Sequence, residues 1–146
     1  MTEPIEKRLL QAVILIGGAF SLFFAVASLT QGTEVLAADP RANVDLDSHF
    51  RYLSGIFLGA LIALYSCVPH VERKGARLRL VGGLIICGGL ARLIGLLTIG
   101  FPGKGHLYGL GLELVFTPLL LLWQSRIARL MNAPAAVDTL TGSATP

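Results

Sequence analysis

The chain has 146 residues, of which 53% are hydrophobic and only 14% are charged. Because a soluble domain carries about 25% charged residues, this composition leaves too little polar surface to cover a water-soluble globule. The formal net charge is +3, but the basic residues gather at the ends of apolar runs, which excludes the basic stripe of a nucleic-acid-binding protein. The composition therefore indicates a small integral membrane protein.

Four apolar runs follow one another along the chain, at residues 10–29, 52–68, 78–99 and 107–123. A helix needs about 20 apolar residues to cross the hydrocarbon, with roughly 17–25 tolerated. The second and fourth runs are short, so we expect them to extend into flanking residues. The first run is longer than the roughly 7–15 apolar residues of a signal peptide, which favours a span over a cleaved leader. We therefore predict an all-α integral membrane four-helix bundle, with residues 1–131 as one domain.

The lysines and arginines are distributed unequally between the two ends of the predicted spans. Eight belong to the end with both termini, and three belong to the other end. The eight are Lys7, Arg8, Arg73, Lys74, Arg77, Arg79, Arg126 and Arg129, and the three are Arg41, Arg51 and Lys104. The positive-inside rule therefore predicts that both termini lie in the cytoplasm. Residues 132–146 are rich in alanine, threonine and proline, and we expect a disordered cytoplasmic tail there.

Small residues recur at every fourth position in the second and third runs, so each set lines one face of a helix. They are Gly55, Gly59, Ala63 and Cys67 in the second run, and Gly83, Cys87, Ala91 and Gly95 in the third. Such stripes let the backbones of membrane helices approach closely. We expect the two helices to pack antiparallel through these faces, and a homodimer contact is the alternative. Pro118 is expected to kink the fourth helix.

Arg92 and Glu113 are the charged residues inside the last two runs. A charge at the bilayer centre costs about 2.5–3.5 kcal/mol on insertion scales, and more in simulations. At about 1.5 Å per residue, each lies about 10 Å from the outer end of its helix. The breaker-rich segment 100–105 predicts a tight turn between these helices. We therefore expect the guanidinium and the carboxylate to pair, either as part of a site or only to fix helix register.

The start of the second helix adds further polar residues on the same side of the membrane. Asp47 and Arg51 are four residues apart, which favours a local ion pair, and Asp47 and Ser48 are N-cap candidates. We predict one outward-opening ligand site, and its candidate residues are Asn43, Asp47, His49, Arg51, Arg92 and Glu113. An arginine at this depth would attract an anionic or carbonyl-bearing head group of a lipid or a quinone.

The sequence carries no nucleophile motif, phosphate-binding loop or dinucleotide fingerprint. The histidines are dispersed, so we predict no catalytic residue, metal or cofactor. The favoured hypothesis is a non-enzymatic protein that binds a lipid-like or quinone-like ligand or a partner membrane protein. A membrane enzyme or redox subunit with Glu113 as acid or base is the alternative. A small transporter is third, because internal repeats and broken helices are not evident.

The stretch HFRYLSGIFLG at 49–59 resembles the FRYLSGIYLG signature of a bacterial four-helix membrane family, known as domain of unknown function 4345. GGLAR at 88–92, LEL at 112–114 followed by Pro118, and the upstream Asn43 are similar to other blocks of that family. The resemblance covers roughly residues 10–129. It implies a multi-pass protein of the bacterial inner membrane with no established activity. The family is distantly similar to DoxX-like membrane proteins, some of which are linked to quinones or redox partners.

Overall fold

The computed structural model describes residues 3–132, and within them every regular element is helical. The four main helices are α1 (Glu3–Gln31), α2 (Val44–Tyr65), α3 (Gly75–Thr98) and a composite rod. The rod consists of α4 (Lys104–Gly111), the π-helical turn η3 (Leu112–Phe116) and α5 (Thr117–Asn132). Two short 3₁₀ segments, η1 (Gly32–Leu36) and η2 (Val68–His70), follow α1 and α2. The predicted all-α four-helix architecture is confirmed.

Four helical segments of the described chain are long and apolar enough to cross a membrane: Pro4–Leu36, Val44–His70, Gly75–Thr98 and Lys104–Met131. The protein is therefore a multi-pass membrane protein. The second and fourth segments extend well beyond the apolar runs 52–68 and 107–123, as expected for spans that borrow flanking residues. Asn132, the first residue of the predicted tail, ends α5, and the rest of that tail lies outside the described residues.

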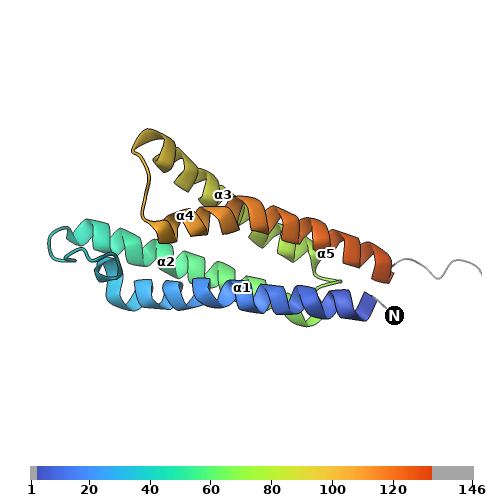
Figure 1. Ribbon diagram of the computed structural model, residues 1–146. Coiled ribbons are helices and arrows are strands. Elements are labelled where there is room, and N and C mark those ends of the chain that lie inside the picture. The colour runs from blue at the N-terminus through green and yellow to red at the C-terminus, as the bar shows by residue number, and fades with distance from the viewer. Residues whose placement is uncertain (1–2, 133–146) are drawn as a thin grey trace, which may run out of the picture.

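The helices run alternately up and down, so both ends of the described chain lie at the same end of the bundle (Figure 1). We call this the basic end, and the opposite end, with η1 and the start of α4, the outer end. α1 packs along α2, and α3 packs against α5 and η3. Figure 1 shows the outer part of α3 leaning away from the α1–α2 pair. The bundle is therefore closed at the basic end and open at the outer end.

The closed end is built around one apolar cluster. Its buried members are Leu10, Ile14, Cys67, Val71, Leu78, Leu120 and Ile127. Polar side chains tie the connection between α2 and α3 to this cluster: Gln11 Nε2 donates to the Val68 carbonyl at 2.7 Å, and the fully buried Gln124 Nε2 donates to the Val71 carbonyl at 2.8 Å. These bonds satisfy backbone carbonyls that the α2–α3 connection would otherwise bury without a partner.

The predicted small-residue packing between α2 and α3 is wrong. A Cβ added at Gly59, Gly83 or Gly95 would meet nothing within 4 Å, and Cys87 is exposed. The close contacts of α3 are instead made by Gly82 and Gly89, which lie on a different face of the helix from Gly83 and Gly95. A Cβ at Gly82 would lie 2.8 Å from Leu121, and one at Gly89 would lie 2.7 Å from the Glu113 Cβ. The glycines of α3 therefore allow close approach of the α4–α5 rod, because α3 is rotated away from the predicted face.

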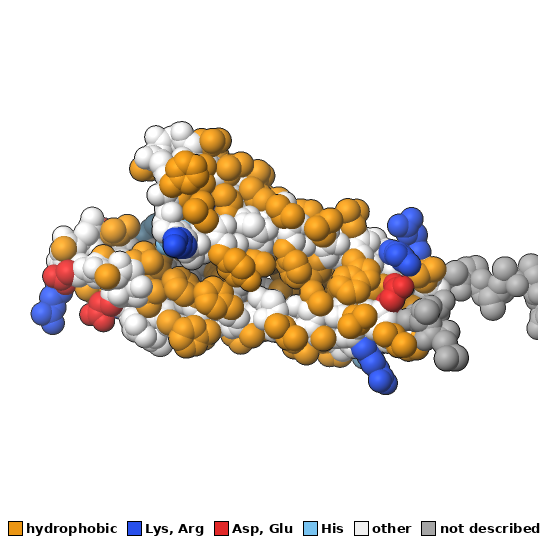
Figure 2. Space-filling model, in the orientation of Figure 1, with side chains coloured by type: hydrophobic (Ala, Val, Ile, Leu, Met, Phe, Trp, Pro, Cys, Tyr) orange, Lys and Arg blue, Asp and Glu red, His pale blue; other side chains and the backbone are white. Residues whose placement is uncertain are grey.

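The surface is mostly apolar between the two ends (Figure 2). Exposed large hydrophobic residues occur on every main helix, among them Ile16, Ile62, Leu97 and Leu122. Most charged side chains on the face shown in Figure 2 lie toward the two ends. This distribution is what a lipid-facing surface requires, because hydrocarbon offers no hydrogen-bond partners to polar groups.

Candidate functional site

Arg92 on α3 and Glu113 in η3 form a bidentate ion pair. Arg92 Nε donates to Glu113 Oε2 and Nη2 donates to Oε1, both at 3.0 Å. The Glu113 side chain is 14% exposed and that of Arg92 is 36% exposed, so the carboxylate is sheltered and the guanidinium is partly accessible. The predicted pairing of the two intramembrane charges is thus present. The parallel bonds use the planar fork of the guanidinium, which a lysine could not reproduce.

The π-helical turn that carries Glu113 has a local cause in the sequence. Pro118 has no backbone N–H and its ring conflicts with the carbonyl four residues earlier, so it cannot continue a regular α-helix. The chain widens into Leu112–Phe116 just before it, and the Thr117 hydroxyl donates to the Leu112 carbonyl at 2.8 Å. The expected proline kink therefore takes the form of a π-turn. Such turns often occur at functional sites.

His106, in the first turns of α4, completes the cluster around Arg92. Its Nδ1 lies 3.0 Å from Arg92 Nη1. A guanidinium can only donate hydrogen bonds, so Nδ1 must be the unprotonated acceptor and the imidazole proton must reside on Nε2. In this geometry the imidazole is neutral. Arg92, Glu113 and His106 therefore form a cluster with no net formal charge.

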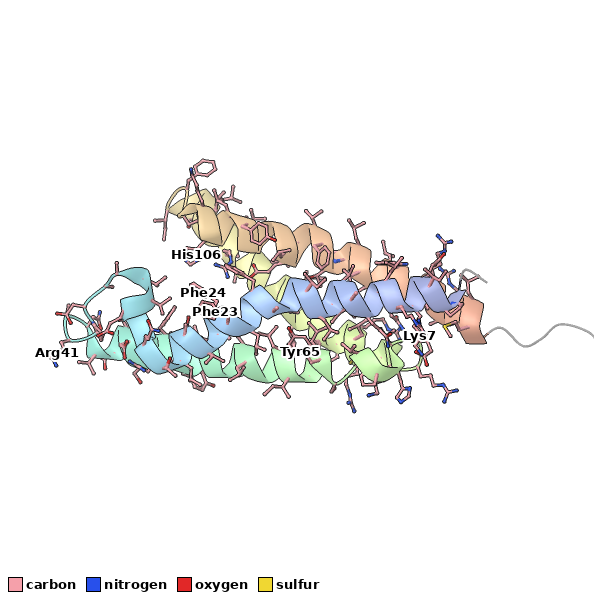
Figure 3. All side chains as sticks on the ribbon, turned by 60° about the horizontal axis from the view of Figure 1, so that its bottom comes forward. Lys7, Phe23, Phe24, Arg41, Tyr65 and His106 are labelled. Carbon is pink, nitrogen blue, oxygen red and sulfur yellow. The ribbon has the colours of Figure 1, made fainter. Side chains whose placement is uncertain are left out.

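This cluster borders a cavity of about 440 Å³ between the outer halves of α1 and α2 and the start of the α4–α5 rod. Figure 3 shows His106 and Phe24 on opposite sides of this gap. The apolar wall consists mainly of Phe20, Phe24, Phe50, Leu53, Phe57 and Leu112. The polar residues are Ser21, Ser28, Ser54, Tyr108 and the Arg92 cluster. A mostly apolar cavity with a few convergent polar groups is the usual form of a small-molecule site.

The cavity continues into the bundle. A second, narrower cavity of about 90 Å³ shares Ser21, Phe57, Gly109, Leu112 and Glu113 with the first. Its other lining residues are almost all apolar and include Ile14, Leu61 and Leu120 from the middle of the bundle. The polar cluster therefore borders an apolar recess, which suits a molecule with a polar head and a hydrocarbon tail.

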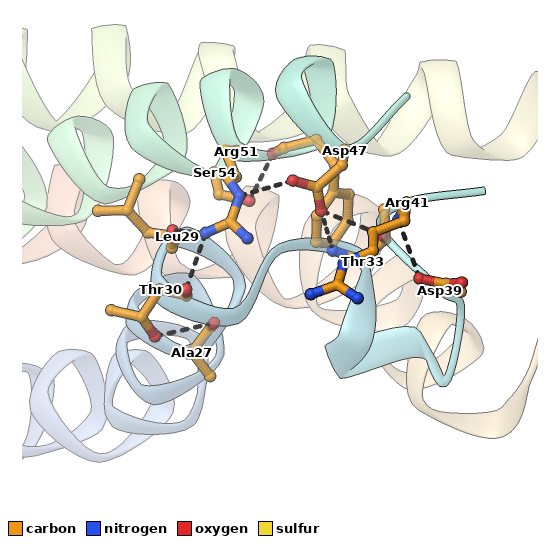
Figure 4. A network of polar contacts seen from close by, with 10 residues as sticks. Ala27, Leu29, Thr30, Thr33, Asp39, Arg41, Asp47, Arg51 and Ser54 are labelled. Atoms are coloured by element: carbon orange, nitrogen blue, oxygen red, sulfur yellow. Dashed lines mark hydrogen bonds and ion pairs between the residues drawn. The ribbon is translucent and has the colours of Figure 1, made fainter. Parts of the chain in front are cut away.

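Asp47 and Arg51 form a separate cluster where α1 turns into α2 (Figure 4). Arg51 Nε donates to Asp47 Oδ2 at 2.7 Å, and Nη1 donates to the carbonyls of Leu29 and Thr30 at the end of α1. Asp47 Oδ1 accepts from both the backbone N–H and the hydroxyl of Thr33. These contacts cap the last turn of α1, so the ion pair fixes the α1–α2 corner.

Gly32 is the residue that lets the corner close. Its φ is +65°, in the left-handed region that favours glycine. A Cβ at this position would stand 2.0 Å from Asp47 Oδ1 and 2.5 Å from Arg51 Nη2. The corner therefore needs glycine both for its backbone conformation and for the space in front of the ion pair.

The structure thus divides the predicted single polar site. Of the candidate residues, Arg92 and Glu113 line the cavity; Asn43, Asp47, His49 and Arg51 do not. Asn43 is the N-cap of α2 and accepts from the Leu46 N–H at 2.9 Å, so the N-cap is not Asp47 or Ser48. His49 is exposed and packs beside Tyr52. The N-cap prediction is wrong because the helix begins at Val44, eight residues before the apolar run 52–68.

The family model described as a domain of unknown function, DUF4345, matches residues 9–124. The chain belongs to this family. Neither the curated proteins nor the solved structures yield a match. The DUF4345 match covers the α1–α2 corner, the Arg92 cluster and every residue named above as lining the cavity.

Within the DUF4345 region, sequence reasoning found the ion pair but missed the other cavity residues. His106 is not among the predicted site residues, although it lies in the first turn of α4 and its Nδ1 is 3.0 Å from Arg92 Nη1. The wall residues Phe20, Phe24 and Phe57 carry no signal that separates them from lipid-facing phenylalanines. The available sequence signal was the serines inside the apolar runs, since Ser21, Ser28 and Ser54 all line the cavity.

Proposed function

We propose that this protein resides in the bacterial inner membrane and binds a lipid-like or quinone-like amphiphile in the cavity bordered by Arg92, His106 and Glu113. The polar head of the amphiphile lies against the cluster, and its apolar part lies along the phenylalanines of α1 and α2. The observation that carries the proposal is the 440 Å³ cavity itself, with a mostly apolar wall and the Arg92–Glu113–His106 cluster in its lining.

Three features support a small ligand over the other hypotheses. The volume falls in the range of about 300–1,000 Å³ that small-molecule pockets occupy. The narrower recess leads inward between the helices, where a tail fits and a partner helix does not. Both carboxylate oxygens of Glu113 accept from Arg92, so the carboxylate is engaged in an ion pair and is not presented as a free acid or base. Binding therefore explains the geometry better than acid–base chemistry or transport.

The test is to purify the protein in a mild detergent, extract the bound small molecules and identify them by mass spectrometry. The variants are Arg92→Leu and Glu113→Gln. Arg51→Leu is the matched control, because it removes an equally paired arginine that does not line the cavity. Loss of one amphiphile from both cavity variants, with retention in Arg51→Leu, supports the proposal.

Unchanged amphiphile content in Arg92→Leu and Glu113→Gln, together with a large fall in thermal stability, would contradict it. The pair would then serve only to fix the register of α3 against the rod. The control separates this outcome from general destabilisation, since Arg51→Leu weakens the fold at the α1–α2 corner without altering the cavity.

A further inference from the structure

The charge balance of the cavity restricts the chemistry of its ligand beyond the proposed function. The guanidinium of Arg92 is neutralised by the bidentate carboxylate of Glu113, and the geometry requires a neutral His106. No other lysine, arginine, aspartate or glutamate of the described chain lines the cavity. An anionic head group would therefore bring a net charge into a sheltered space with nothing to compensate it, which is costly at membrane depth.

The cavity does, however, hold hydrogen-bond donors in excess. Arg92 makes three hydrogen bonds within the described chain, and a guanidinium has more N–H donors than these bonds use. The imidazole proton on His106 Nε2 is a further donor. Ser28, which is 3% exposed, adds a hydroxyl to the lining of the cavity. Buried donors need acceptors, and a ligand with carbonyl, ether or hydroxyl oxygens would supply them.

We propose that the cavity selects an uncharged amphiphile with a hydrogen-bond-accepting head group, and that Glu113 sets this selectivity by neutralising Arg92. The inference rests on the proposed function, because it concerns the ligand of the same cavity. Without Glu113, the lone guanidinium would favour an anionic head, because each anion would then complete a charge pair. The carboxylate is thus a specificity-determining residue that acts through Arg92.

Two probes that differ by a single phosphate group test this selectivity. 1-Oleoylglycerol and 1-oleoylglycerol 3-phosphate share the acyl chain and the glycerol, and the second adds a phosphate. Both are titrated into the purified full-length protein, and bound probe is counted by native mass spectrometry. We expect the wild-type protein to prefer the neutral probe by about tenfold or more, which corresponds to about 1.4 kcal/mol.

Glu113→Gln should reverse the preference toward the phosphate, because Gln keeps the shape of the side chain and removes its charge. Since an unpaired arginine in the membrane can prevent folding, Arg92→Gln/Glu113→Gln provides a second measurement. This double variant has no charge in the cavity and should retain the preference for the neutral probe, with weaker binding.

A wild-type protein that prefers the phosphate probe would overturn the inference while leaving the proposed function standing. A Glu113→Gln protein that folds and keeps the wild-type preference would overturn the role of Glu113. If neither probe binds to the wild type, and purified samples carry no amphiphile, both the inference and the proposed function fail.

Discussion

The outer half of the molecule contains two arginine–carboxylate pairs of the same chemistry in different settings. Asp47 and Arg51 lie one turn apart on a single helix. Asp47 also accepts a hydrogen bond from Thr33, and Arg51 also donates to backbone carbonyls at the end of α1. Arg92 and Glu113 come from different helices and bond to each other and to His106, beside a cavity. The first pair is bonded to backbone groups, whereas the second lines a cavity.

The role of an ion pair in a membrane protein therefore depends on the other hydrogen-bond partners of its two side chains. A pair whose bonds end on backbone carbonyls holds the chain in place. A pair that borders a space of 440 Å³ has donors left for another molecule. We therefore expect the Asp47–Arg51 pair to stabilise the fold and the Arg92–Glu113 pair to contribute to ligand binding. Substitutions at each pair should separate these two effects.

The largest effect on stability is expected from Gly32→Ala, at the first pair. The substitution places a Cβ 2.0 Å from Asp47 Oδ1 in a left-handed backbone conformation. Backbone strain and overpacking together should cost about 3 kcal/mol, which thermal unfolding in detergent would register as a large loss. Gly59→Ala is the control, since its Cβ would meet nothing within 4 Å. Equal stability of the two variants would contradict the role given to the corner.

A smaller loss of stability, joined to a loss of ligand, is expected from Gly89→Ala, at the second pair. Its Cβ would lie 2.7 Å from the Glu113 Cβ and 2.8 Å from Leu114, so α3 and η3 must move apart at a cost of about 1–3 kcal/mol. Gly88→Ala, one residue away, meets nothing within 4 Å and should leave both properties unchanged. If the two variants bound equal amounts of ligand, the cavity would not depend on the spacing of α3 and η3.

The smallest effect is expected at the basic end, outside the spans, where Glu72 pairs with Lys7 at 3.0 Å. Burial raises the pKa of the Glu72 carboxyl, but its own backbone N–H and the Lys7 ammonium outweigh burial and hold the pKa below its ordinary value of 4.5. A depressed folded-state pKa means that the stabilisation is complete above about 4.5 and disappears as the pH falls through the lower folded value.

The measurement at Glu72 is the difference in melting temperature between the wild type and Glu72→Gln as a function of pH. The wild type should be more stable by a constant amount above pH 4.5, and the difference should shrink at lower pH. Glu34→Gln, at an exposed residue of η1, controls for the loss of a carboxylate. A difference that grows on acidification would show that the sign is wrong.

The fold was largely predictable because hydropathy reports lipid exposure directly. The four spans followed from the apolar runs, and the pairing of Arg92 with Glu113 followed from equal depth on helices joined by a short connection. What sequence could not give was the rotation of α3. Glycines occur in adjacent registers, at 82 and 83 and at 88 and 89, so spacing alone does not tell which of each pair contacts the rod.

The site was predicted only in part for a related reason. Asp47 and Arg51 share the outer end with Arg92, and charge and depth alone placed them in one cluster. Their partition depends on the left-handed turn at Gly32, which directs Asp47 to Thr33 and Arg51 to the end of α1. The cavity depends on the tilt of α3 and on the π-turn before Pro118. A hydropathy profile predicts neither feature.

The central claim is that the space beside Arg92 and Glu113 holds a ligand, and filling that space tests it most directly. Gly105 and Gly111 both lie on α4 with open space at the Cβ position, but only Gly105 lines the cavity. Native mass spectrometry of Gly105→Phe and Gly111→Phe should find the co-purifying amphiphile lost from the first and retained in the second. Equal amphiphile content in the two variants would contradict the account.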